Sequence, residues 1–165
     1  AKNINEAIDE GLGALVKENV QLIWQTGKPY FEQAGRRAAG YADRVKVLDF
    51  ISEMDYAYAA ADLVVSRAGA LAIAELCIAG KPVIFVPYPF AAEDHQTGNA
   101  MALVSKNAAW YVKDSDAKGE LVKKVIALLH DSATQDTMSR NLKAAAIKDA
   151  DERIAKKVIE IAAVN

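Results

Sequence analysis

The sequence predicts an α/β domain of the Rossmann-like, doubly wound class, in which helices cover both faces of a parallel sheet. Apolar patterns of helical period alternate with short apolar strand patterns along most of the 165 residues. Segments 63–65 and 83–86 are unbroken runs of apolar residues, which is typical of parallel strands buried on both faces. No stretch of linker composition divides the chain, so we expect one domain over residues 1–165.

The spacing of apolar residues and the positions of glycines predict the order of the elements. Ile4, Ile8 and Leu15 lie on one face of a first helix, and Gly69 and Gly80 bracket an apolar helix between two strands. The predicted helices cover residues 3–18, 30–40, 54–61, 70–80, 95–108, 118–130, 134–146 and 151–164. The predicted strands cover residues 21–27, 44–50, 63–69, 82–89 and 109–113.

Composition narrows the classes of partner. A net charge of −2 and a pI near 5.7 give no basic stripe, so nucleic acid is not an expected ligand. Cys77 has no second cysteine to pair with, and His95 and His130 lie far apart, so we expect neither a disulfide nor a metal site. No apolar run approaches the roughly 20 residues of a membrane span, and the first residues do not resemble a signal peptide. We therefore expect a cytoplasmic protein.

The predicted sheet has an edge at which a ligand is expected. In doubly wound folds, ligands bind beyond the carboxyl ends of the strands, where loops lead into helix N-termini. The loops at those ends combine small residues with polar ones, which lets backbone N–H groups approach an anion or a sugar. They are residues 25–29, 49–55, 66–70 and 87–100. The pattern favours a nucleotide or sugar-nucleotide site.

Glu75 is the one charged residue in the apolar helix 70–80. An unpaired carboxylate would be heavily penalised if it were buried. Glu75 is therefore either a solvated residue on the exposed edge of the helix or a side chain that faces the crevice. In the second case its two oxygens are suited to accept hydrogen bonds from both hydroxyls of a ribose.

Polar side chains also gather where the helix at 95–108 begins. Asp94 is a suitable N-cap. Gln96 and Asn99 lie three residues apart on the first helical turn, where their amides either form a polar helix start or contact sugar hydroxyls. His95 is a candidate base, but no orienting partner is visible in the sequence, so a hydrogen-bonding loop residue is the favoured interpretation.

The run ADLVVSRAGALAIAELCIAGKPVIFVPYPFAAEDHQTGNA, residues 61–100, resembles the donor-binding half of the MurG family of bacterial peptidoglycan N-acetylglucosaminyltransferases. The shared pattern is D-x-v-x-x-R-x-G-a-x-t-x-x-E, then G-x-P-x-i-l-i-P-y-P, then D-x-Q-x-x-N-A. The resemblance extends more weakly over the whole chain. Ala72 departs from it, since many members carry Thr there, and the family's glycine-rich GGS loop would precede Ala1.

The resemblance implies the C-terminal half of a GT-B glycosyltransferase, whose Rossmann-like domain binds UDP-N-acetylglucosamine. It implies that Glu75 takes the ribose hydroxyls, that Gln96 reads the hydroxyls of the N-acetylglucosamine and that Asn99 is its neighbour in the motif. Ile51 matches the residue whose backbone reads the uracil edge.

By the same resemblance, Arg67, Gly69 and Ala70 form the loop and helix N-terminus near the diphosphate, where helix amides favour an anion. No metal or cofactor is implied. The catalytic base and the contacts to the lipid-linked muramyl-pentapeptide are expected in a separate N-terminal domain, and the whole enzyme is expected as a peripheral protein at the inner face of the cell membrane. The chain itself is thus expected to carry no catalytic residue.

Two alternatives stay open. A non-catalytic nucleotide-sugar-binding subunit would show the same site. A domain like that of UDP-N-acetylglucosamine 2-epimerase would share the fold, although the D-x-Q-x-x-N-A pattern argues against it. A response-regulator-like domain is not favoured, because the strand at 21–27 ends without an acidic cluster.

Overall fold

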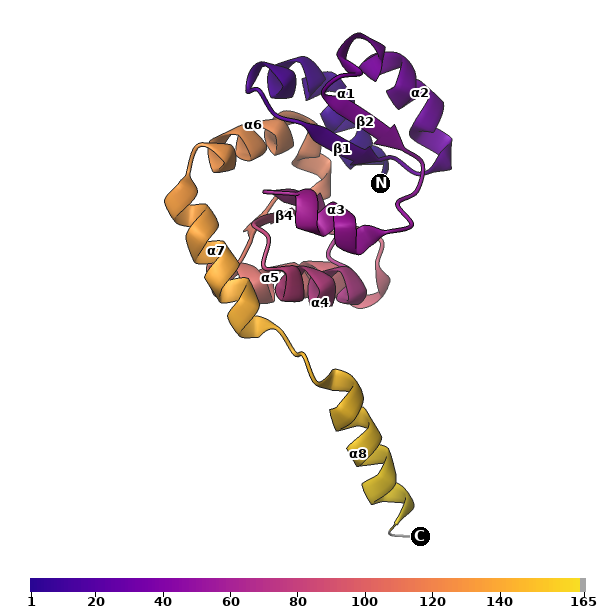
Figure 1. Ribbon diagram of the computed structural model, residues 1–165, viewed down its shortest axis with the longest axis vertical. Coiled ribbons are helices and arrows are strands. Elements are labelled where there is room, and N and C mark those ends of the chain that lie inside the picture. The colour runs from indigo at the N-terminus through magenta and orange to yellow at the C-terminus, as the bar shows by residue number, and fades with distance from the viewer. Residues whose placement is uncertain (164–165) are drawn as a thin grey trace.

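The computed structural model describes residues 1–163, in which helices and parallel strands alternate along the chain (Figure 1). The helices are α1 (Lys2–Lys17), α2 (Lys28–Ala38), α3 (Met54–Ala60), α4 (Ala70–Ala79), α5 (His95–Val104), α6 (Ala117–Leu129), α7 (Ser132–Ala145) and α8 (Ala150–Ala162). The strands are β1 (Leu22–Gln25), β2 (Val45–Leu48), β3 (Val64–Ser66), β4 (Val83–Phe85) and β5 (Trp110–Tyr111). Every predicted element is present within residues 1–163, and the observed bounds are shorter by a few residues at most strand ends. Residue 164, the last of the predicted helix 151–164, lies outside the described residues.

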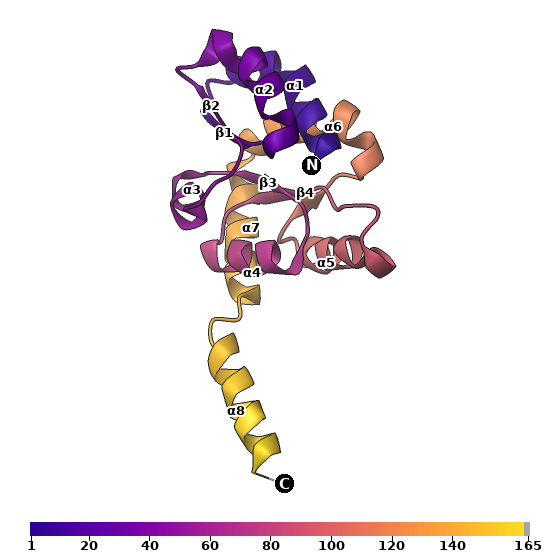
Figure 2. The ribbon, with the colours of Figure 1, turned by 90° about the vertical axis from the view of Figure 1, so that its right-hand side faces the viewer.

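The strands form two parallel sheets. β1 pairs with β2, with Leu22 opposite Val45, and the second sheet has the order β3-β4-β5, with Val64 opposite Val83. Among the described residues, no ladder hydrogen bond joins β1 to β3. The two sheets lie one above the other in Figure 2.

β4 is the buried centre of the larger sheet, and all three of its residues are buried. Its side chains alternate between two cores, as period-2 strand geometry requires. Ile84 packs with α1 and α6, whereas Val83 and Phe85 pack with α4, α5 and α7. Helices therefore cover both faces, which confirms the doubly wound α/β prediction. β3 is only half-buried, because one of its edges has no strand beside it in the described residues.

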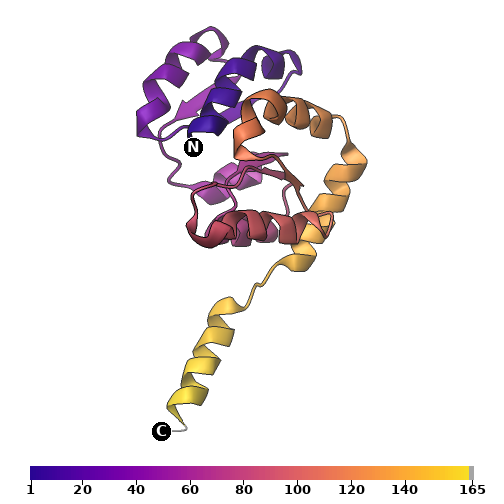
Figure 3. The ribbon, with the colours of Figure 1, turned by 180° about the vertical axis from the view of Figure 1, so that it is seen from behind.

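The core that contains Ile84 also contains Trp24 of β1 and Val45 of β2. Residues of α1 and α6 complete it, including Leu12 and Leu121, neither of which is exposed to solvent. These two helices pack directly against each other and lie side by side in front of the strands in Figure 3, which shows the molecule from behind. Hydrophobic packing of α1 and α6, rather than strand pairing, thus joins the two sheets.

α8 extends away from the rest of the molecule in Figures 1, 2 and 3. All of its residues are exposed, including the apolar Ile154, Val158 and Ile161 on one side of the helix. No helix among residues 1–163 has both the length and the apolar composition to cross a membrane.

Candidate functional site

The carboxyl ends of β3 and β4 bring two segments of the motif region together. Ser66 ends β3 and is followed by the loop 67–69, which leads into α4. Phe85 ends β4 and is followed by the loop that leads into α5. Because the two strands are parallel neighbours, both loops emerge at the same edge of the sheet, as predicted.

Arg67 lies under these loops with a largely buried guanidinium group. Its Nη1 donates to the carbonyl oxygens of Val86 and Pro87 at 2.9 and 3.0 Å, and to Asp114 Oδ1 at 2.5 Å. The guanidinium also lies 5.6 Å from the ring centroid of Tyr88. Arg67 therefore ties the end of β4 to the turn at Asp114, and its charge is paired within the protein.

Gln96 and Asn99 hold the loop that follows β3. Gln96 Oε1 accepts from the backbone N–H of Tyr88 at 3.0 Å and of Ala68 at 3.3 Å, and Asn99 Nδ2 donates to the carbonyl of Ala68 at 3.2 Å. The two amides thus brace both loops from the first turns of α5. Gln96 Oε1 is used in these bonds, which leaves its NH₂ group as the part of the amide that can donate elsewhere.

α4 begins at the carboxyl end of the sheet with Gly69 as its N-cap and Ala70 as its first residue. Glycine has no side chain to cap the first-turn N–H groups, so these groups are left to water or a ligand. Such an N-terminus carries a partial positive charge that favours an anion. At the other end, Gly80 stops the helix with φ +61 and donates its N–H to the carbonyl of Leu76.

Glu75 is half-buried in the middle of α4. Its Oε2 accepts a hydrogen bond of 3.1 Å from the hydroxyl of Tyr58, which lies on α3. Burial and the neighbouring Glu75 carboxylate raise the pKa of Tyr58 to about 12, so Tyr58 is a neutral donor at physiological pH. The carboxylate is neither free in solvent nor fully buried.

Ile51 lies in the loop after β2, on the smaller sheet. Its backbone N–H donates to Gln25 Oε1 at 2.8 Å, and Gln25 is the last residue of β1. The register places Gln25 opposite Leu48, so both loops begin at the same level of the sheet. The N–H that is predicted to read a base edge thus has an exposed side-chain acceptor in this structure.

His95 and Asp94 have local partners. His95 Nδ1 lies 2.6 Å from the carbonyl of Ala92, as expected of a hydrogen-bonding loop residue. Asp94 occupies the N-cap position of α5, as predicted, but its carboxylate accepts from the Thr97 hydroxyl at 2.7 Å instead of from a backbone N–H. Its φ of 50° is left-handed, whereas the usual N-cap residue that bonds a first-turn N–H has an extended backbone.

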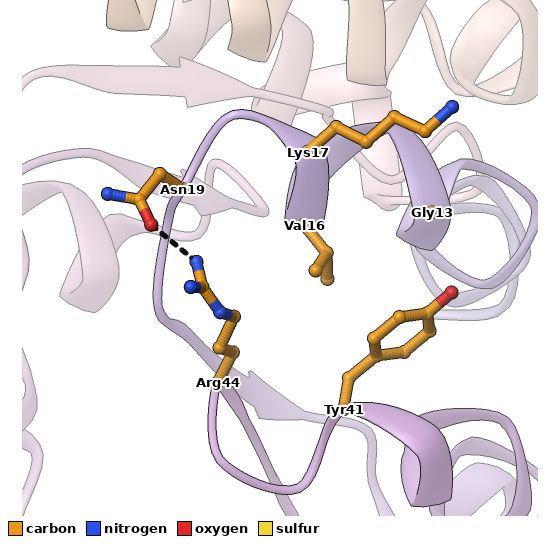
Figure 4. A pocket seen from close by; sticks show the side chains of 6 residues that line it. All are labelled: Gly13, Val16, Lys17, Asn19, Tyr41 and Arg44. Atoms are coloured by element: carbon orange, nitrogen blue, oxygen red, sulfur yellow. Dashed lines mark hydrogen bonds between the residues drawn. The ribbon is translucent and has the colours of Figure 1, made fainter.

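The surface of the described residues has hollows. One, of about 450 Å³, lies at the C-terminal end of α1 and is lined by Lys17, Asn19, Tyr41 and Arg44, with Gly13 and Val16 (Figure 4). Arg44 donates to Asn19 along one side of this hollow. This end of the molecule is remote from the motif region. Another hollow, of about 400 Å³, lies between α3 and α4, and Tyr58 and Glu75 line it. Within residues 1–163 no three acidic, histidine or cysteine side chains gather into a possible metal site.

Residues 1–154 match the family described as Glycosyltransferase family 28 C-terminal domain. The chain belongs to this family. It is 50% identical over 161 residues to the UDP-N-acetylglucosamine–N-acetylmuramyl-(pentapeptide) pyrophosphoryl-undecaprenol N-acetylglucosamine transferase of Cytophaga hutchinsonii, an alignment that covers 98% of this chain and 43% of that protein. The family 28 chain thus spans less than half the length of this curated relative.

A solved family 28 relative has the same fold. The crystal structure of MurG from Acinetobacter baumannii superposes with a TM-score of 0.83 at 30% identity, over 97% of this chain and 46% of that one. A UDP-N-acetylglucosamine 2-epimerase superposes with a TM-score of 0.65 at 18% identity, over 99% of this chain and 41% of that one. At that identity the epimerase shares the fold alone. The predicted C-terminal GT-B half is confirmed.

In this family 28 domain, three residues that were not predicted from the sequence contact predicted site residues. Tyr58 contacts Glu75, Gln25 contacts Ile51, and Asp114 pairs with Arg67. Gln25 begins the loop 25–29 that was predicted at a carboxyl strand end, which was a usable signal. Tyr58 resembles a core aromatic in its alanine-rich helix, and Asp114 lies 47 residues from its partner, so neither contact could be inferred from a local pattern.

Proposed function

We propose that residues 1–165 form the UDP-N-acetylglucosamine-binding domain of an inverting glycosyltransferase. The whole enzyme transfers N-acetylglucosamine to a lipid-linked muramyl-pentapeptide during peptidoglycan synthesis. Membership of family 28, together with the 50% identity to a transferase of that name, is the observation that carries the proposal. The braced loops at the start of α4 and α5 are its structural support.

The proposed contacts follow the ligand from base to sugar. The backbone of Ile51 reads the uracil edge, and Glu75 accepts from the ribose hydroxyls. The diphosphate lies at the N-terminus of α4, near Gly69 and Ala70, where first-turn N–H groups and the helix dipole favour an anion.

Gln96 and Asn99 serve the sugar end of the same ligand. Gln96 donates through its NH₂ group to the N-acetylglucosamine, and Asn99 keeps the adjacent loop in place. Arg67 adds positive charge beneath the diphosphate but acts mainly through its bonds to Val86, Pro87 and Asp114.

The catalytic base and the acceptor contacts belong to the N-terminal domain of the whole enzyme. A base must lie within about 3 Å of the acceptor hydroxyl. We assign no residue of this chain to that role. Because the acceptor is lipid-linked, the whole enzyme works as a peripheral protein at the inner face of the cell membrane.

Calorimetric titration tests the proposal. UDP-N-acetylglucosamine and UDP should both bind, and ADP should bind at least 10-fold more weakly, because an adenine edge does not match the uracil contacts. Equal affinity for ADP and UDP would exclude the assignment. A transfer assay with labelled donor and lipid acceptor should show turnover by the full-length enzyme and none by residues 1–165 alone.

A further inference from the structure

We propose that Tyr58 is a positioning residue for Glu75, which it orients toward the ribose hydroxyls of the nucleotide. The inference rests on the proposed function and adds to it a residue that works through another side chain. Its basis is the hydrogen bond of 3.1 Å from the Tyr58 hydroxyl to Glu75 Oε2, which joins α3 to α4.

Tyr58 is itself held in place. Its ring packs against the buried cluster that contains Leu76, Cys77 and Phe85. The helices α3 and α4 are in contact and lie near each other in Figure 2. The hydroxyl therefore projects from a fixed ring, and the position of the Glu75 carboxylate is set by the core rather than by solvent.

An oriented carboxylate has a functional advantage here. A glutamate in the middle of a helix has several rotatable bonds, and fixing such a side chain on binding carries an entropic cost. The Tyr58 bond uses one oxygen and restricts the carboxylate before the ligand arrives. A carboxylate has about four lone-pair sites on its two oxygens, so it can still accept from both hydroxyls of a ribose.

The neighbouring helix residue offers a matched control. Tyr56 lies two positions earlier on α3 and is 68% exposed. Both tyrosines can be changed to phenylalanine with the loss of a single oxygen. The elevated pKa of Tyr58 agrees with a hydroxyl that keeps its proton in order to donate to the carboxylate.

The test is titration of the full-length protein with UDP and with 2′,3′-dideoxyuridine diphosphate, which lacks both ribose hydroxyls. Tyr58→Phe should raise the Kd for UDP about 3- to 10-fold, the range expected for losing one pre-ordered side chain. It should change the Kd for the dideoxy compound less than about 2-fold on the same reasoning. Tyr56→Phe should alter neither affinity.

The Glu75→Gln background separates this inference from the function on which it rests. There, Tyr58→Phe should weaken UDP binding no further. Equal losses for UDP and the dideoxy compound would assign Tyr58 a purely structural role and overturn the inference, while the proposed function would stand. If Glu75→Gln itself left UDP affinity unchanged, both the inference and the ribose assignment would fall.

Discussion

Gly11 of α1 and Val122 of α6 are in such close contact that a Cβ added at Gly11 would lie 2.5 Å from Val122 Cγ2. Both neighbours belong to the helix pair that joins the two sheets. Gly13, two residues later, has only Tyr41 Oη within reach, at 3.9 Å. One helix thus carries a glycine that packing requires and another that packing does not.

Gly11→Ala is expected to lower the free energy of unfolding by about 1–3 kcal/mol, the usual cost of overpacking. Gly13→Ala should raise it by about 0.5–1 kcal/mol, because alanine is the better helix former. Urea denaturation of both variants checks this. If Gly11→Ala is destabilising, adding Val122→Ala should restore part of the lost free energy of unfolding. A stabilised Gly11→Ala would instead show that the two helices can move apart at little cost.

Glu75→Gln should weaken UDP binding by about 1.5–3 kcal/mol, the range for a hydrogen bond to a charged group. The melting temperature should hardly change, since glutamine can still accept from Tyr58. Glu120→Gln on the exposed surface of α6 is the control and should have no effect on binding. A loss below about 0.5 kcal/mol would mean that Glu75 does not contact the ribose hydroxyls.

Gln96 permits a test that separates its two roles. Gln96→Glu keeps an oxygen that accepts from the N–H groups of Ala68 and Tyr88 but loses the NH₂ donor. We expect UDP-N-acetylglucosamine to bind about 10-fold more weakly, since one hydrogen bond is worth about 1 kcal/mol or more, while UDP affinity and melting temperature stay nearly constant. If Gln96→Glu bound both ligands normally, the amide would serve the loop and not the sugar.

Arg67→Ala should destabilise the fold by about 3 kcal/mol, because it leaves Asp114, whose side chain is 11% exposed, without a cationic partner and with only the Asn3 amide as a side-chain donor. Arg67→Lys keeps the charge, but its side chain is one bond shorter than the reach to Nη1, the atom that donates to Val86, Pro87 and Asp114, so an intermediate loss is expected. Thermal unfolding measures both. An unaltered melting temperature for Arg67→Ala would contradict the structural role.

The pKa of Tyr58 predicts an alkaline limit to stability. The pKa is raised from 10 to about 12 by burial and by Glu75, so above pH 10 the unfolded chain loses the proton while the folded chain keeps it. The stabilising contribution is complete below pH 10 and is lost as the pH rises toward 12. The other charged residues that line the hollow beside Tyr58 and Glu75 are Asp55 and Lys81. Denaturation from pH 8 to 11.5 should show a shallower decline for Tyr58→Phe than for the wild type or Tyr56→Phe.

Local sequence patterns predicted the helices and strands well, because each pattern depends on residues close together in the chain. The buried run at Val83–Phe85 reads as a strand because nothing polar interrupts it, and Gly69 and Gly80 mark the two ends of α4. The separation into two sheets was not predicted, since strand pairing is decided by contacts between distant segments.

The candidate site was predictable in part. The motif located Glu75, Gln96 and Asn99 in segments that the fold brings together, but their roles as ligand contacts stay predictions. The bonds from Gln96 to Ala68 and Tyr88 cross 28 and 8 residues, so no local pattern could indicate them. Tyr58 illustrates the same limit, because an aromatic residue in a helix has the same local signature whether it fills a core or orients a carboxylate.

The division into two sheets has a mechanical consequence for a long ligand. Ile51, the proposed base contact, is carried by the β1-β2 sheet, whereas Glu75 and Gln96 are carried by the β3-β4-β5 sheet. In the part of the chain that the structure describes, the two sheets are joined through helix packing and not through a shared ladder. A substitution that shifts this shared core would therefore change the distance between the base contact and the sugar contacts, although it touches neither end of the ligand.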